Sequence, residues 1–115
     1  MSLPLVIIES PFSAKTARGL VRNHNFAKAA LHHSITLHEI PFLSHLFYTQ
    51  FLSDKLEEDR RLGMEAGWAL YERCDFVAVY IDLGFSYGMV AGIERAARLA
   101  RPIVYREINW LMGDK

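Results

Sequence analysis

Residues 76–81 form an unbroken run of six apolar residues, Phe-Val-Ala-Val-Tyr-Ile. A strand with one face in water alternates apolar and polar residues, so a continuous apolar run indicates burial on both faces. Parallel strands are buried in this way because the helices that connect them cover both sides of the sheet. The run therefore predicts an inner strand of a parallel sheet.

Other segments complete this pattern. The apolar runs at 5–8 and 102–105, and the stretch rich in β-forming residues at 35–43, predict three more strands. Helical spacing of apolar residues predicts helices over about 14–32, 53–73 and 88–100. Pro41 limits the second strand to an edge or an end of the sheet. Strands that alternate with helices predict a three-layer α/β fold with a parallel sheet of four to five strands and helices on both faces.

Composition narrows the class of protein. The 115 residues, 51% of them hydrophobic, predict a single domain over 1–115 with a core of its own. Lys and Arg balance Asp and Glu at 13 each, which argues against nucleic-acid partners and against a polybasic membrane surface. No apolar run approaches the roughly 20 residues of a membrane helix, and the N-terminus lacks the pattern of a signal peptide. We therefore expect an intracellular, cytoplasmic protein without membrane partners.

Metal and dinucleotide sites have no sequence support. Cys74 is the only cysteine, which excludes an internal disulfide and a cysteine-based zinc site. His32 and His33 point about 100° apart on a helix, and the other histidines lack a common zinc spacing. Neither a Gly-x-Gly-x-x-Gly motif nor a phosphate-loop lysine is present. We expect no metal and no cofactor.

Candidate site residues follow the predicted strands, because ligands of parallel α/β sheets bind beyond the carboxyl ends of the strands. Ser13 has the alternative role of capping a helix, Phe12 that of packing, and Ser86 that of a second helix cap. His24 lies on the expected apolar face of the first helix, which favours a core or interface role. The candidate ligand-binding residues are Ser10, Phe12, Ser13, His45, Ser86, Gly88, Met89 and Gly92.

Four segments in order resemble the nucleoside 2-deoxyribosyltransferase-like family, including its short bacterial and phage members. They are the Ser-Pro-aromatic turn within 6–13, the stretch 44–54, the helix and strand entry at 62–75, and the strand and loop at 79–89. The resemblance implies a flavodoxin-like (Rossmann-like) domain that cleaves or transfers N-glycosidic bonds of nucleosides or their monophosphates. It also implies a homo-oligomer, and a glutamate that attacks the anomeric carbon from the start of the last helix.

The chain departs from the family pattern at that glutamate. The pattern Gly-Met-x-x-Glu reads Gly88-Met-Val-Ala-Gly92 here, and Glu94 lies about 200° around the helix from position 92. Glycine inside a helix costs about 0.5–1 kcal/mol relative to alanine, so we expect something, such as a ligand close to the backbone, to need the space. Loss of the site by drift is the alternative. The candidate catalytic acids are then Glu65, in the Gly-Met-Glu stretch, and Asp82, at the end of the apolar strand.

Three functional hypotheses follow. The first is a protein that binds a nucleoside, a nucleotide or a nucleotide-derived signal without covalent chemistry. The second is an N-glycosidase or transferase in which Glu65, Asp75, Asp82 or His45 activates water, although Asp75 falls at the amino end of its strand, away from the expected site. The third is an interaction protein, which the apolar stretch at 110–112 supports.

Overall fold

The computed structural model describes residues 2–110. The elements follow the predicted alternation, with two short helices added after the second strand. In chain order they are β1 (Leu5–Glu9), α1 (Ala17–Thr36), β2 (Ile40–Phe42), α2 (Ser44–Phe47), a 3-10 helix (Tyr48–Gln50), α3 (Glu57–Tyr71), β3 (Phe76–Tyr80), α4 (Tyr87–Arg98) and β4 (Ile103–Arg106).

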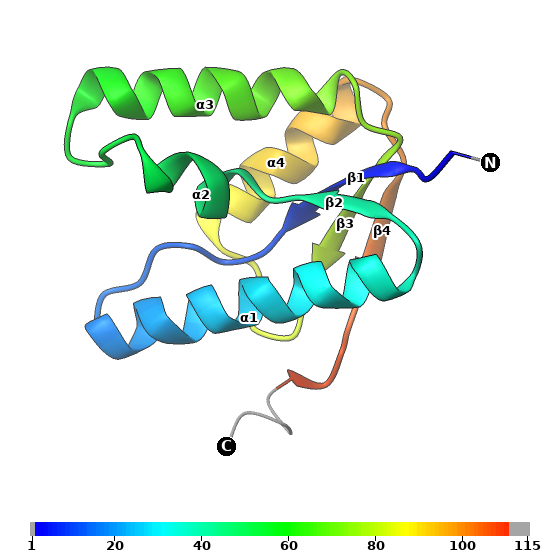
Figure 1. The fold of residues 1–115 in the computed structure, drawn as a ribbon, viewed down its shortest axis with the longest axis horizontal. Coiled ribbons are helices and arrows are strands. Elements are labelled where there is room, and N and C mark those ends of the chain that lie inside the picture. Colours follow the sequence, from blue (N-terminus) through cyan, green and yellow to red (C-terminus); the bar gives the residue numbers. More distant parts are fainter. Residues whose placement is uncertain (1, 111–115) are drawn as a thin grey trace.

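The four strands form one parallel sheet in the order β2-β1-β3-β4. The apolar run at 76–81 becomes β3, an inner strand, and its three central residues are fully buried. Helix α1 covers one face of the sheet, and α3 and α4 cover the other (Figure 1). The predicted three-layer α/β fold is confirmed. The strand order changes direction between β1 and β3, which is where ligands bind in sheets of this type.

Alternating side chains of β1 supply both cores. Val6 and Ile8 point toward α1, where they pack with Phe26 and Tyr80. Ile7 points toward α3 and α4. Because successive strand residues face opposite sides, Glu9 belongs to the same face as Ile7.

The second strand is shorter than predicted. The expected strand over 35–43 is only Ile40–Phe42, and α1 continues to Thr36. Two backbone features separate helix from strand: Leu37 caps the helix, and His38 turns the chain with a φ of 62°. β-Branched residues at 35 and 36 were therefore a misleading strand signal, because tertiary packing outweighs so weak a propensity.

The buried face of α1 also differs from the prediction. Leu20, Val21 and His24 are exposed, so the prediction of a core position for His24 was wrong. Asn23 is buried instead, and its side-chain amide donates to the carbonyl oxygens of Phe12 and Ser13 at 3.1 Å each. A polar residue with internal partners can replace an apolar one in a core, which apolar periodicity alone does not reveal.

The remaining boundaries shift by a few residues. Helix α3 begins at Glu57, a few residues after the expected start at 53, and its first turn carries three acids that suit the helix dipole. Ser86 caps α4 by accepting from the Met89 amide at 3.2 Å. Of the apolar stretch at 110–112, only Trp110 falls within the described residues. It packs edge-on against Phe26, with 5.3 Å between the two ring centroids. Within residues 2–110, no helix is long and apolar enough to cross a membrane.

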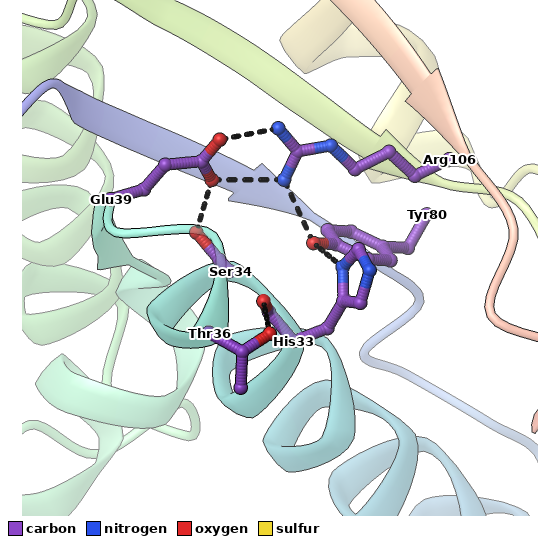
Figure 2. A network of polar contacts seen from close by, with 6 residues as sticks. All are labelled: His33, Ser34, Thr36, Glu39, Tyr80 and Arg106. Atoms are coloured by element: carbon purple, nitrogen blue, oxygen red, sulfur yellow. Dashed lines mark hydrogen bonds and ion pairs between the residues drawn. The ribbon is translucent and has the colours of Figure 1, made fainter.

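A polar network lies on the α1 side of the sheet (Figure 2). Arg106 of β4 donates to both carboxylate oxygens of Glu39, at 2.9 and 2.6 Å, and to the Tyr80 hydroxyl at 2.9 Å. Ser34 donates to the same carboxylate at 2.5 Å, and His33 shares a hydrogen bond of 2.8 Å with Tyr80. The network ties the end of α1 to the last two strands.

Candidate functional site

A cavity of about 290 Å³ opens at the carboxyl end of β1, between α3 and α4. Its walls come from the turn after β1, the start of α2, one face of α3 and the first two turns of α4. This is the edge of the sheet at which the change in strand order predicts a ligand. All eight candidate ligand-binding residues line this one cavity: Ser10, Phe12, Ser13, His45, Ser86, Gly88, Met89 and Gly92.

Glu9 is the acid of this cavity, although it is not among the sequence-predicted site residues. Its carboxyl lies directly against the backbone of Gly92. A Cβ added to Gly92 would overlap Oε2 of Glu9, and would come within 2.5 Å of its Cδ and 2.8 Å of the Tyr71 hydroxyl. The space at position 92 is thus filled by a carboxyl group from β1 and a hydroxyl from α3.

Within the part of the chain that the structure describes, no cationic side chain lines the cavity around Glu9. The Tyr71 hydroxyl donates a short hydrogen bond to Oε2, and it is the only side-chain partner of this carboxyl among residues 2–110. Burial raises the pKa of Glu9 from its ordinary value of 4.5 to about 8. At neutral pH the carboxyl is therefore mostly protonated, and it can donate a proton to a bound molecule.

One face of α3 supplies residues that the sequence prediction missed. Met64, Gly67, Trp68 and Tyr71 line the cavity, at the i, i+3, i+4 and i+7 spacing of a single helix face. Gly67 allows close approach of α2, since a Cβ there would come within 3.1 Å of the Ser44 Cβ. The spacing was visible in the sequence, but nothing in it showed that this face meets the end of β1.

His45 and Phe12 form a stacked pair at the mouth of the cavity. Their ring centroids are 4.7 Å apart with an angle of 25° between the planes. Burial lowers the pKa of His45 to about 4, so the ring is neutral near pH 7. Its Nε2 lies 3.4 Å from the Ser10 carbonyl oxygen and in the neutral ring donates to it, which leaves Nδ1 as an acceptor.

Two polar atoms of this wall are buried without a partner. They are the Oγ of Ser10 and the Nδ1 of His45, neither of which has a hydrogen bond within the described part of the chain. Buried polar groups are nearly always hydrogen-bonded, because the loss of water is costly unless another partner replaces it. The Ser10 hydroxyl can donate and accept a hydrogen bond, and the Nδ1 of His45 can accept one. Together these two groups suit a ligand that carries hydroxyl or amine groups.

Two larger cavities adjoin the first one and share Phe12, Ser13 and His45 with it. One, of about 430 Å³, lies between the 3-10 helix and α3, with Tyr48 and Met64 in its wall. The other, of about 510 Å³, lies over the exposed apolar residues Leu20 and Val21 of α1. A ligand that reaches Glu9 therefore has room to extend past the Phe12–His45 pair.

Both predicted catalytic acids lie outside the cavity. Glu65 follows Met64 on α3, and one residue turns a helix by about 100°, which places Glu65 outside the face that lines the cavity. Its carboxylate accepts a hydrogen bond from Arg61 at 2.7 Å. Asp82 accepts from the backbone amides of Ile108 and Trp110 at 2.9–3.1 Å, and so fastens the segment after β4 to the end of β3. Asp75, at the amino end of β3, binds the Leu5 amide at 2.7 Å.

Across residues 2–110, no group of three or more His, Cys, Asp or Glu side chains is arranged to hold a metal ion.

Comparison with protein families assigns the chain. A family model described as "Domain of unknown function (DUF7768)" matches residues 4–106. The chain belongs to this family. The matched region of this DUF7768 domain runs from just before β1 to the end of β4, so it includes the whole sheet and the cavity.

Comparison with solved structures relates the fold to an enzyme fold. The 2-deoxyribosyltransferase from the psychrotolerant bacterium Bacillus psychrosaccharolyticus superposes with a TM-score of 0.67 and 13% identity, over 90% of this chain and 72% of that one. That enzyme is described as a biocatalyst for the synthesis of antiviral and antitumoral nucleosides. At this identity the likeness establishes a distant relationship of fold, which agrees with the resemblance found in the sequence. No curated protein matches the chain.

Proposed function

We propose that this protein cleaves the N-glycosidic bond of a nucleoside-type ligand, and that Glu9 is the acid that protonates the leaving base. The observation that carries the proposal is the carboxyl of Glu9 against Gly92, the position at which the family resemblance leads one to expect a glutamate. The similar fold of a 2-deoxyribosyltransferase supports a nucleoside as the ligand class.

The chemistry follows from a neutral carboxyl in a buried place. Protonated Glu9 donates its proton to the base nitrogen as the bond between that nitrogen and the anomeric carbon breaks. The bonding electrons leave with the base, and the sugar carbon becomes positively charged. A water molecule then attacks this carbon and returns a proton to the Glu9 carboxylate, so that atoms and charges balance. If a second base attacks in place of water, the same steps transfer the sugar.

Other residues of the cavity have positioning roles in this proposal. The hydrogen bond from Tyr71 occupies Oε2 of Glu9 and leaves Oε1 to carry the proton. The unpartnered Oγ of Ser10 and Nδ1 of His45 can bind hydroxyl or amine groups of the ligand. The Phe12–His45 pair offers an aromatic edge to the base. Ser13, Ser86, Gly88 and Met89 complete the wall.

A second candidate is nucleoside binding without chemistry, which is favoured by the glycine at position 92. In that case Glu9 and Tyr71 only fill the space beside α4, and their hydrogen bond is structural.

One set of measurements separates these functions. The protein is incubated with a panel of nucleosides and nucleotides; released base is followed by chromatography and binding by calorimetry. We expect base release, a decrease in kcat of about 10²–10⁴-fold in Glu9→Gln with binding retained, and a rate that falls as pH rises through about 8. Glu65→Gln is the matched control, because it neutralises an exposed glutamate outside the cavity and should leave the rate unchanged.

The other outcomes are equally definite. Binding without release by the unmodified protein would establish the second candidate and exclude catalysis. The absence of both binding and release across the panel would exclude a nucleoside site and favour an interaction protein.

A further inference from the structure

The described wall of the Glu9 cavity contains no side-chain cation. Of the described residues that line it, Glu9 is the only acid, His45 is neutral near pH 7, and none is a lysine or an arginine. The cavity therefore supplies no side-chain cation for an anionic group.

The adjoining cavities do not supply an excess of cations either. Asp54 lines both of them, and Asp59 lines the one beside α3. Arg60, in that same wall, is the one arginine or lysine among the described residues of these walls. His24 lies in the wall over α1. Carboxylates thus outnumber the arginine wherever a ligand could extend from Glu9.

An arginine outside the cavity wall is only partly engaged: the Nε of Arg95 has no hydrogen-bond partner among the described residues, but its guanidinium is held away from the cavity. Arg95 lies on the far side of Trp68, with its guanidinium carbon 5.3 Å from the ring centroid. It also pairs with Glu72 at 3.7 Å. The start of α4 does border the cavity, but Ser86 already occupies the Met89 amide, and a helix end carries only about half a positive charge.

From this charge distribution we infer that the cavity accepts the uncharged nucleoside and discriminates against its 5′-phosphate. A phosphate monoester carries about −1.5 to −2 charges at neutral pH. Its burial beside Glu9 would remove water without supplying a cation, and such a buried charge is strongly disfavoured. The inference rests on the proposed function and narrows its substrate class.

The test measures binding without turnover. Glu9→Gln is titrated by calorimetry at pH 6.5, where the glutamine mimics the neutral carboxyl, with 2′-deoxyadenosine, thymidine and the 5′-monophosphate of each. We expect each nucleoside that binds to do so at least about tenfold more tightly than its monophosphate, a difference of about 1.4 kcal/mol. A monophosphate that binds as tightly as its nucleoside, or more tightly, would overturn the inference while leaving a nucleotide-cleaving function intact.

A variant at the cavity rim tests whether charge is the cause. Met64 lines both the Glu9 cavity and the cavity beside it, and it is 54% exposed, so a lysine there can keep its amine in water. In the Glu9→Gln background, Met64→Lys should reduce the preference for the nucleoside several-fold, and Met64→Gln, the uncharged control, should not. An unchanged preference in Met64→Lys would show that charge does not set the selectivity.

If none of the four compounds binds or is cleaved, the proposed function fails as well, and the inference falls with it.

Discussion

Two buried glutamates on opposite faces of the sheet have opposite electrostatic environments. Glu39, on the α1 side, receives two hydrogen bonds from Arg106 and one from Ser34. Burial works to raise its pKa, but these charged and polar donors outweigh burial, and the pKa is lowered. Glu9, on the α3 and α4 side, has one hydroxyl partner and no cation, and its pKa rises to about 8.

The difference separates a structural carboxylate from one available for chemistry. Glu39 is a permanent anion whose oxygens are occupied, and it holds α1 against β4. Glu9 is mostly a neutral acid that lines a cavity. Perturbed acids that line a cavity are candidates for acid-base roles, whereas paired ones usually belong to the framework.

Loss of the arginine partner should give the largest effect on stability. Arg106→Met leaves Glu39 buried without its cation, and the free energy of unfolding should fall by about 3–5 kcal/mol in a denaturant titration. The two side chains are only 15% and 8% exposed, so water cannot replace the lost bonds. The double variant Glu39→Gln with Arg106→Met should recover part of the loss. A decrease below about 1 kcal/mol in the single variant would mean that the pair contributes little.

The pH dependence of stability should show that Glu9 is buried without a cation. Folded Glu9 holds its proton up to about pH 8, whereas the unfolded chain releases it near the ordinary value of 4.5. Between these values the folded state binds more protons, so Glu9 lowers stability as pH rises, by up to about 1.4 kcal/mol per pH unit. The stability that the folded state gains by keeping Glu9 protonated is fully present below pH 4.5 and is lost by about pH 8.

Glu9→Gln should lack this slope, and its stability relative to the unmodified protein should increase from pH 5 to pH 8. Denaturation at several pH values in both proteins measures the difference, in which the other titrating groups cancel. Parallel curves for the two proteins would mean that Glu9 titrates normally.

Filling the space beside Glu9 should have a smaller effect. Gly92→Ala places a methyl group against the Glu9 carboxyl and the Tyr71 hydroxyl, and should lower the free energy of unfolding by about 1–3 kcal/mol. Gly88→Ala, on the same helix, has nothing within 4 Å of the new methyl group and should gain up to about 1 kcal/mol from helix propensity. Thermal unfolding of the two variants provides the comparison. Equal effects at both positions would contradict the close packing at Gly92.

Part of the site could have been predicted from β1 alone. Ile7 and Glu9 share a face because strand side chains alternate, so an acid at the carboxyl end of that face was predictable. The sequence instead favoured Glu65, for its place in the Gly-Met-Glu stretch, and Asp82, for its place at the end of the apolar strand. Glu65 pairs with Arg61 one helix turn earlier, which the i,i+4 spacing in the sequence could have shown. The backbone amides that bind Asp82 come from the segment after β4, and only the folded chain brings them there.

The sequence by itself determined the α/β class, the parallel sheet and the segments that surround the cavity, because apolar runs and helical spacing are local properties of the chain. It also marked Gly92 as a position that requires space. Only the tertiary structure decided what fills that space. Glu9 and Gly92 are more than 80 residues apart, and their contact depends on how β1, α3 and α4 pack. The same packing leaves Glu9 without a cation and gives Glu39 one, because charge compensation depends on neighbours in space rather than in sequence.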